Sequence, residues 1–372
     1  MSWRMTSSAT TMRLRVARMG GHAARFLTSR NTARIAAVFE RSLYFEADGA
    51  FCCVGTGGIG NGPINAVIEG AQTPSWLRGT QVGQHVEISG ACARWPGHRL
   101  EFAQAQLWRP EPWPEIANAS GLQSALACVD TIAARAAPPE GLSRCAILPT
   151  SNDGAASPLD HLAVPRIKAL SDWIFARVDV EHQSDNSPAP PVDLLGLGPG
   201  LTPSGDDVLC GVLIALDAIR SLGAAAQLER FPVDLNRQRT PGAVGWVKVT
   251  GRDPTFPGIP WMLGRASSRS DAPQSTLDPT YAESALAAAI QAAAPTATSP
   301  LSAAFLKAAA EGQGSEALHR FIAAAIAADL AALPEMIAAL GRIGHTSGWD
   351  AMGGAVLTLK AAANADRARQ SP

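Results

Sequence analysis

The chain has 372 residues, of which 47% are hydrophobic and only 17% are charged, and its formal net charge is -1 at pH 7. This length predicts two domains, and the near-neutral charge argues against nucleic acid or anionic lipid as a partner. The six cysteines show no C-x-x-C spacing, so we expect neither a zinc site nor a disulfide framework. No stretch reaches the ~18 uninterrupted apolar residues that a membrane span requires. We therefore expect a cytoplasmic protein that binds small molecules, without nucleic-acid or membrane partners.

The first segment, residues 1–34, is expected to be a flexible N-terminal extension. Residues Met1 to Leu27 are rich in Arg, Ser and Thr and lack the apolar region of a secretory signal. An organelle transit peptide would share this composition, but a flexible extension is the simpler interpretation.

Residues 35–115 are expected to form a β domain. Short β-type runs punctuated by glycine extend from Ile35 to Trp108, and Asp48-Gly49 between two of them is a hairpin signal. The pattern predicts a small sandwich or barrel without distinguishing the two.

Residues 116–372 are expected to form a mainly helical domain, so the fold class is α+β. Alanine-rich segments with helical periodicity lead to eight expected helices: Gly121 to Ala137, Pro158 to Val178, Gly205 to Leu222, Tyr281 to Ala293, Ser302 to Ala310, Ser315 to Ala332, Pro334 to Leu340 and Ser347 to Ala363. Two segments, His182 to Pro191 and Thr240 to Pro279, are Pro-rich and lack periodicity, which is typical of lids or inserted loops.

The most informative motif is the glycine-rich segment Leu194 to Asp207, LLGLGPGLTPSGDD, which leads directly into an apolar helix. Gly198 and Gly200 allow close backbone approaches, and the N–H groups and dipole at a helix N-terminus attract anions. The motif has neither the lysine of a P-loop nor the spacing of a dinucleotide fingerprint. It therefore predicts a binding loop for phosphate, carbamoyl phosphate or a carboxylate.

Two adjacent carboxyls close this motif, and each has a structural alternative. Ser204 and Asp207 have capping-box spacing, so Asp207 is explained equally well by helix capping and by chemistry. Asp206 is not needed for the cap, and a buried charge requires a partner. This favours a functional role for Asp206, and we expect Asp206→Asn to reduce activity with little change in melting temperature.

A second loop-to-helix junction, Gly341 to Asp350, repeats the pattern S-G-x-D. At a constant offset of 143 residues, matches are found in both loops and both helices: Leu197, Gly198, Ser204, Gly205, Asp207, Gly211 and Leu216 correspond to Leu340, Gly341, Ser347, Gly348, Asp350, Gly354 and Leu359. We expect the two helix N-termini to converge on one concave site, with Gly211 and Gly354 where the helices approach each other. The alternative is two independent capping boxes on unrelated core helices.

These motifs resemble the AllH-like family of oxamate carbamoyltransferase subunits. The resemblance rests on GLGPGLTPSGDD, on GHTSGWDAMGG and more weakly on GIGNGP (Gly58 to Pro63) and Thr298 to Ser302, and it extends from about Val38 to Leu359. The stretch Thr240 to Pro279 and the long N-terminus depart from the family pattern.

The resemblance implies a subunit of a transferase that converts oxalurate and phosphate into oxamate and carbamoyl phosphate, in the degradation of allantoin. It also implies partner subunits, one of them similar to acyl-CoA synthetases, and a small anionic substrate. Two alternatives remain: a metal-dependent small-molecule hydrolase, and a non-catalytic assembly subunit of such a complex.

The expected site combines both helix entrances. Asp206, Asp207, His345 and Asp350 are the catalytic candidates, with His345 moving the proton. The sequence identifies no definite cofactor, although the three Asp side chains are also suited to hold a magnesium ion. The candidates for substrate binding are Asn61, Gly198, Gly200, Thr202, Ser204, Gly205, Thr346, Ser347 and Gly348.

Overall fold

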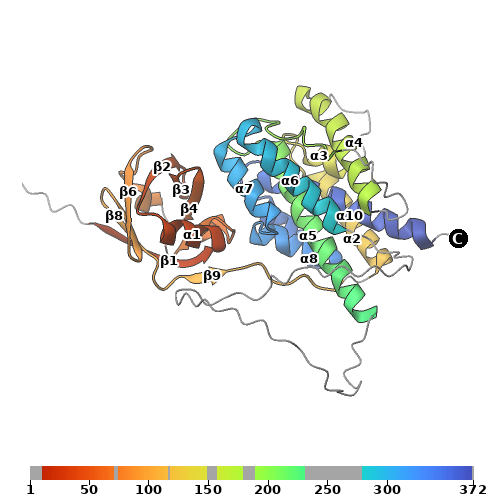
Figure 1. Cartoon of the computed structure of the whole chain (residues 1–372), viewed down its shortest axis with the longest axis horizontal. Coiled ribbons are helices and arrows are strands. Elements are labelled where there is room, and N and C mark those ends of the chain that lie inside the picture. Colours follow the sequence, from red (N-terminus) through yellow and green to blue (C-terminus); the bar gives the residue numbers. More distant parts are fainter. Residues whose placement is uncertain are drawn as a thin grey trace, which may run out of the picture.

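The computed structural model describes residues 11–70, 74–115, 118–148, 157–178, 189–230 and 279–370. The two Pro-rich segments predicted from the sequence, 182–191 and 240–279, lie outside the described residues except at their C-terminal ends. A β-barrel lies at one end of the long axis of the molecule and a bundle of helices at the other (Figure 1). The expected α+β fold class is thus confirmed, and the barrel is the correct choice between the two expected β architectures.

The barrel is formed by a single sheet that closes on itself. Its strands are β1 (Met12–Gly20), β2 (Thr32–Val38), β3 (Ser42–Ala47), β4 (Ala50–Gly55), β5 (Asn65–Ile68), β6 (His85–Ser89), β7 (Cys92–Trp95), β8 (His98–Glu101) and β9 (Gln106–Trp108). The order is β5-β4-β3-β2-β6-β7-β8-β1-β9, and β5 also pairs with β1. Eight strands therefore close the barrel, and β9 adds an extra strand beside β1.

Alternating side chains explain why these segments fold as strands. In β6, Val86 and Ile88 are buried and their neighbours are exposed, which is the period of two expected for one buried face. Short 3-10 turns, Gly57–Ile59 and Pro74–Leu77, flank β5. The tip of the β3–β4 hairpin has positive φ at Asp48 (51°) and Gly49 (71°), so the predicted hairpin is confirmed.

The expectation that residues 1–34 form a flexible extension is wrong for residues 12–34. β1 is the strand that closes the barrel, and the helix α1 (Gly21–Ser29) buries Ala23, Phe26 and Leu27 in the barrel core. The charged residues of β1 point outward while Leu14 and Val16 point inward. The arginine-rich composition of this segment concealed a strand with alternating burial. Residues 1–10 lie outside the described part of the chain.

The helical region contains α2 (Ala119–Ala136), α3 (Ser143–Ile147), α4 (Pro158–Val178), α5 (Ser204–Arg230), α6 (Pro279–Ala297), α7 (Pro300–Ala310), α8 (Glu316–Ile326), α9 (Leu333–Leu340) and α10 (Ser347–Gln370). All eight expected helices are present, and α3 was not expected. α8 ends earlier than predicted because Ala328 adopts a left-handed conformation with φ 54°. Within the described residues, no helix combines the length and apolar character needed to cross a membrane.

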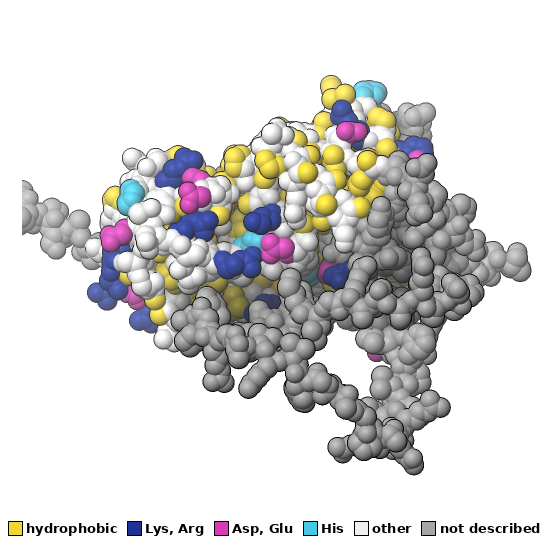
Figure 2. Space-filling view, in the orientation of Figure 1, with side chains coloured by type: hydrophobic (Ala, Val, Ile, Leu, Met, Phe, Trp, Pro, Cys, Tyr) yellow, Lys and Arg dark blue, Asp and Glu magenta, His cyan; other side chains and the backbone are white. Residues whose placement is uncertain are grey.

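The barrel and the helical region meet along a seam formed mainly by α1, β4 and α7. At its centre, Phe51, Cys53 and Ile64 of the barrel pack against Leu301 of α7 in a separate hydrophobic cluster. At its edge, Glu311 accepts hydrogen bonds from His22 (3.0 Å) and Arg25 (3.2 Å). Basic, acidic and histidine side chains gather over this junction on the face shown in Figure 2.

Candidate functional site

The N-termini of α5 and α10 lie next to each other. The Thr202 hydroxyl, just before α5, is 3.1 Å from the Ser347 hydroxyl at the start of α10. The Ser347 hydroxyl also favours the charged form of Asp207, and the Ser204 hydroxyl favours that of Asp350, so each carboxyl interacts with the serine of the other helix. The two helix entrances therefore lie together, as predicted, while the shared concave site that they were expected to line stays a prediction.

Two glycines allow the helices to cross in contact. A Cβ at Gly211 would lie 1.8 Å from the backbone oxygen of Ala351, and a Cβ at Gly354 would lie 1.9 Å from that of Val208. Only hydrogen in place of a side chain permits this approach, as predicted from the repeat. The two contacts are related by the same offset of 143 residues, so the crossing is a local two-fold arrangement of two equivalent helix entrances.

The residue-by-residue correspondence between the two helix entrances does not extend, at the same offset, to the loops that precede them. Gly205 packs against the backbone oxygen of Leu194 and the side chain of Leu197, whereas Gly348 packs in the same way against Leu340 and Ile343. Leu194, rather than Leu197, is thus the structural counterpart of Leu340. The constant offset fails here because the first loop is longer, and the sequence match of Leu197 with Leu340 is coincidental.

Asp206 lies in a fully satisfied polar network. Its side chain is 1% exposed and accepts hydrogen bonds from the Gly196 amide (2.8 Å), the Ser302 hydroxyl (2.6 Å) and the Thr298 hydroxyl. These donors belong to the loop before α5 and to the entrance of α7. Asp206 therefore holds three segments of the helical region together, a role that satisfies its buried charge without a ligand.

Asp350 is buried in a comparable way. Its Oδ1 accepts the backbone N–H groups of Leu142 (2.6 Å) and Ser143 (2.8 Å) at the start of α3. Gly141 lies directly over this carboxyl, because a Cβ there would be 2.7 Å from Oδ1. Burial raises the pKa of Asp350, while these backbone donors and the Ser204 and Thr346 hydroxyls lower it, and burial prevails.

Asp207 is less buried than Asp206 and Asp350, which are 1% and 0% exposed. Its Oδ2, like that of Asp350, is buried without a hydrogen-bond partner among the described residues. Burial raises the pKa of Asp207 well above its ordinary value, and the nearby Asp350 and Asp206 raise it further, against the opposing effects of the Ser347 and Thr202 hydroxyls. A carboxyl with a raised pKa holds its proton to higher pH than an ordinary aspartic acid, which suits it to donate a hydrogen bond or a proton.

The remaining candidate residues lie in two places: some are on the loops before α5 and α10, and Asn61 is at the seam between the barrel and the helices. Gly200 and His345 are exposed on the two loops, and Thr346 is partly buried beside Asp350. Asn61 instead lies at the seam, where its amide donates to Glu316 of α8 (2.8 Å) and its backbone oxygen accepts the Glu316 N–H (3.0 Å). The structure thus places Asn61 at the entrance of α8 and not at that of α5 or α10.

Sequence analysis did not identify the donors that hold the two buried carboxyls. Thr298 and Ser302 were noted only as a weak family match, although Ser299-Pro300 before an apolar run is a helix-entrance signal. Gly141 and the short α3 gave no periodic pattern. These partners lie 92 residues or more from the carboxyls they contact, so only the fold brings them together.

Within the described ranges, no group of three or more His, Cys, Asp or Glu side chains is arranged to hold a metal ion. Asp206 and Asp350 direct oxygens to protein donors. A magnesium ion at Asp206, Asp207 and Asp350 stays a prediction from the sequence.

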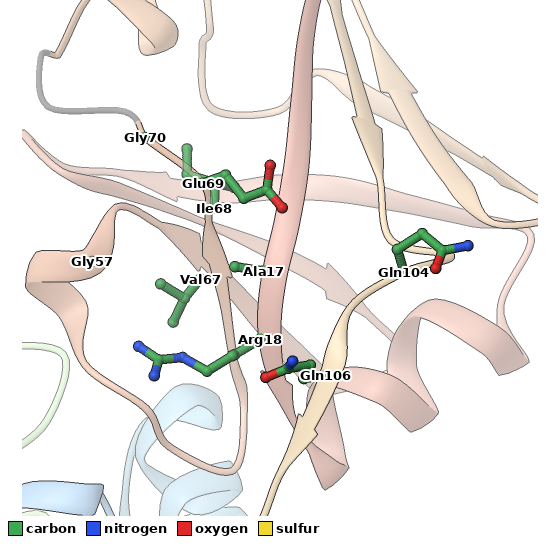
Figure 3. A pocket seen from close by; sticks show the side chains of 9 residues that line it. All are labelled: Ala17, Arg18, Gly57, Val67, Ile68, Glu69, Gly70, Gln104 and Gln106. Atoms are coloured by element: carbon green, nitrogen blue, oxygen red, sulfur yellow. The ribbon is translucent and has the colours of Figure 1, made fainter.

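A cavity of about 490 Å³ lies in the barrel, away from these loops. Figure 3 shows it between β1, β5 and β9, with Arg18 beside Gln106 and with Glu69 on the opposite side. Its lining has none of the residues of the two helix entrances. The cavity is thus separate from the α5–α10 site.

Comparison with known proteins gives one family match. The family described as oxamate carbamoyltransferase subunit AllH matches residues 194–242 and 273–359. The match is interrupted within the segment 240–279, which sequence analysis treats as an insertion, and it does not include the barrel or Gly58 to Pro63. No curated protein and no solved structure matches the chain. Over these residues, from the loop before α5 to α10, the chain is similar to the AllH family of oxamate carbamoyltransferase subunits.

Proposed function

We propose that this chain is a subunit of a carbamoyltransferase-type enzyme and that the α5 and α10 entrances bind its small anionic substrate. The observation that supports this most strongly is the position of Asp207, whose buried Oδ2 has no partner where two helix N-termini meet. The family match covers both entrances. Partner subunits and a cytoplasmic location belong to the same proposal.

The geometry favours a phosphate or carboxylate at this position. The positive dipole ends of α5 and α10 meet here, and the partly buried hydroxyls of Thr202, Thr346 and Ser347 supply donors. The raised pKa of Asp207 favours its neutral form, which repels an anion less than a carboxylate does. Gly198 and Gly200, with positive φ of 116° and 98°, shape the loop around this point.

In the proposed reaction, a phosphate oxygen attacks the carbamoyl carbon of oxalurate. The new C–O bond forms carbamoyl phosphate, and the C–N bond to the oxamate nitrogen breaks. That nitrogen is a poor leaving group unless it is protonated. Asp207 donates this proton and recovers one from the attacking hydrogen phosphate, so the step is balanced. His345, exposed on the neighbouring loop, is in this scheme a proton carrier to solvent.

The test is carbamoyl transfer by the purified chain with and without its partner subunits. We expect little or no conversion of oxalurate and phosphate by the chain alone and clear conversion after the partners are added, because a subunit shares its reaction with the complex. A control complex assembled without this chain should be inactive. Full turnover by the isolated chain, or full activity of the complex without it, would contradict the proposal.

The non-catalytic assembly subunit remains a second candidate because of a specific observation. Asp206 accepts hydrogen bonds from the entrance of α7, Oδ1 of Asp350 accepts them from α3, and the glycines serve helix packing. On this alternative, the complex needs the chain for assembly, and substitutions at Asp207, Thr202 and Ser347 leave its turnover unchanged. Measuring carbamoyl transfer by complexes that contain these substituted chains therefore distinguishes the two candidates.

A further inference from the structure

A second cavity, of about 610 Å³, lies at the seam between the barrel and the helical region. Residues of α1 and the β3–β4 hairpin form one wall, and residues of α6 and α7 form the other. We propose that this seam cleft binds a small organic anion that combines a phosphate or carboxylate with an apolar body. The proposal is independent of the α5–α10 site, because no residue of that site lines the cleft.

The size of the cleft is in the range of small-molecule sites, which are typically about 300–1,000 Å³ and mostly apolar with a few polar groups. Its apolar lining comes from both halves of the molecule. It comprises Phe26, Ala50, Phe51, Ile64, Ile290, Ala294, Pro295, Ala303, Ala304 and Leu306. An aromatic or aliphatic body would be enclosed between the barrel and the helices.

The charged part of the lining is mainly basic. Arg25, Arg30 and Lys307 contribute three permanent cations, and Asp48 is the single carboxylate of the lining. Glu311 neutralises Arg25, at 3.2 Å. No described residue forms an ion pair with Arg30 or Lys307, so these two cations remain available for an anion.

Arg30 shows this incomplete pairing most clearly. Its guanidinium lies 4.9 Å from the centre of the Phe26 ring, and it donates to the Ser29 hydroxyl at 3.2 Å. Its Nε atom is nevertheless buried without a partner in the part of the chain that the structure describes. A buried N–H group without an acceptor is unfavourable, and an anionic ligand at the mouth of the cleft would supply one.

The positive charge of the cleft does not depend on His22. Burial lowers its pKa, and so do the adjacent Arg25 and Lys307, while Glu311 has the opposite effect. The neutral ring donates a hydrogen bond to Glu311, and Arg30 and Lys307 supply the attraction for an anion. The recognised chemistry is therefore a single anionic group next to an apolar surface.

The experiment is calorimetric titration of the full chain with four probes: 1-naphthyl phosphate, 1-naphthoate, 1-naphthol and inorganic phosphate. We expect saturable binding of at least one naphthyl anion, and at least tenfold weaker binding of 1-naphthol and inorganic phosphate. The preferred naphthyl anion identifies the group that the cations recognise. Tenfold is about 1.4 kcal/mol of binding free energy, a reasonable contribution from one desolvated charge pair.

Two variants locate the binding site. Lys307→Gln removes a cation, and Ala303→Leu fills part of the cleft, and each should weaken binding of the naphthyl anion at least tenfold. Lys168→Gln, at an exposed position on α4, is the matched control and should bind as the unmodified chain does. Asp207→Asn should also leave this binding unchanged, which separates the outcome from that of the proposed function.

Three results would overturn the proposal. Neither naphthyl anion binds saturably, 1-naphthol binds as tightly as the anions, or Lys307→Gln binds as tightly as Lys168→Gln. Circular dichroism and melting temperature verify that each variant is folded before titration. If Ala303→Leu does not fold, the Lys307→Gln comparison alone decides the result.

Discussion

Asp206, Asp207 and Asp350 are three neighbouring carboxyls with different surroundings. Protein donors satisfy Asp206 and Oδ1 of Asp350, whereas Asp207 and Asp350 each keep one buried oxygen without a partner among the described residues. Asp350 is 0% exposed, and Asp207 is only partly buried. From the sequence, Asp206 was the stronger functional candidate because a helix cap needs no second carboxyl. In the structure the partners of Asp206 are protein groups and not a ligand: the Thr298 hydroxyl just before α7 and the Ser302 hydroxyl within it. Asp207 is consequently the carboxyl most available for chemistry.

Asp206→Asn should lower the free energy of unfolding by about 1–3 kcal/mol, because an amide cannot accept all the hydrogen bonds that the carboxylate accepts. The sequence alone predicts little change in stability for Asp206→Asn. The hydrogen bonds seen in the structure replace that prediction with a loss of stability. Urea unfolding monitored by circular dichroism measures the loss. Asp193→Asn, exposed on the same loop, is the control and should not change the midpoint. An unchanged midpoint for Asp206→Asn would show that the network contributes no net stability.

Asp207→Asn should instead stabilise the chain at neutral pH. The folded-state pKa of Asp207 is raised, so its favourable contribution is complete below the unfolded pKa and is lost as pH rises through the folded pKa. Asparagine has no such titration. The difference in melting temperature between variant and unmodified chain should therefore be small near pH 4 and grow in favour of the variant towards pH 8. A difference that shrinks with pH would contradict the raised pKa.

At the scale of elements, the crossing of α5 and α10 organises the helical region. The pattern S-G-x-D and the later glycine predicted it from the sequence, because glycine at a close helix contact has a direct steric reason. The loops were less predictable. Leu197 and Leu340 match by residue type, but the longer first loop makes Leu194 the true counterpart of Leu340.

Gly211→Ala and Gly354→Ala should each destabilise the chain by about 1–3 kcal/mol, because the added methyl groups would overlap backbone atoms that cannot move independently. Gly21→Ala is the matched control. A Cβ there has its nearest neighbour at 3.6 Å, on the flexible Gln313 side chain, and alanine favours helix more than glycine does. Thermal unfolding of the three variants measures the contrast. Equal stability of all three would mean that the helices do not cross in contact.

At the scale of the whole molecule, the barrel and the helices were predictable because alternation and helical periodicity are local signals. The position of β1 was missed because its exposed arginines resemble those of an extension, and its closure of the barrel depends on pairing with the distant β5 and β8. The contacts between the barrel and the helical region could not be predicted from the sequence either. Asn61 is close in sequence to a family-like segment, yet its contacts are with Glu316 of α8.

The central claim is that the two helix entrances form one working site with Asp207 as its acid. The most direct measurement is the rate of carbamoyl transfer by the assembled complex containing Asp207→Asn, compared with complexes containing the unmodified chain or Asp193→Asn. The account predicts a loss of about a hundredfold or more for Asp207→Asn, as expected for removal of a proton-transfer group, with an intact complex and undiminished melting temperature. A rate within about twofold of the unmodified complex would contradict it.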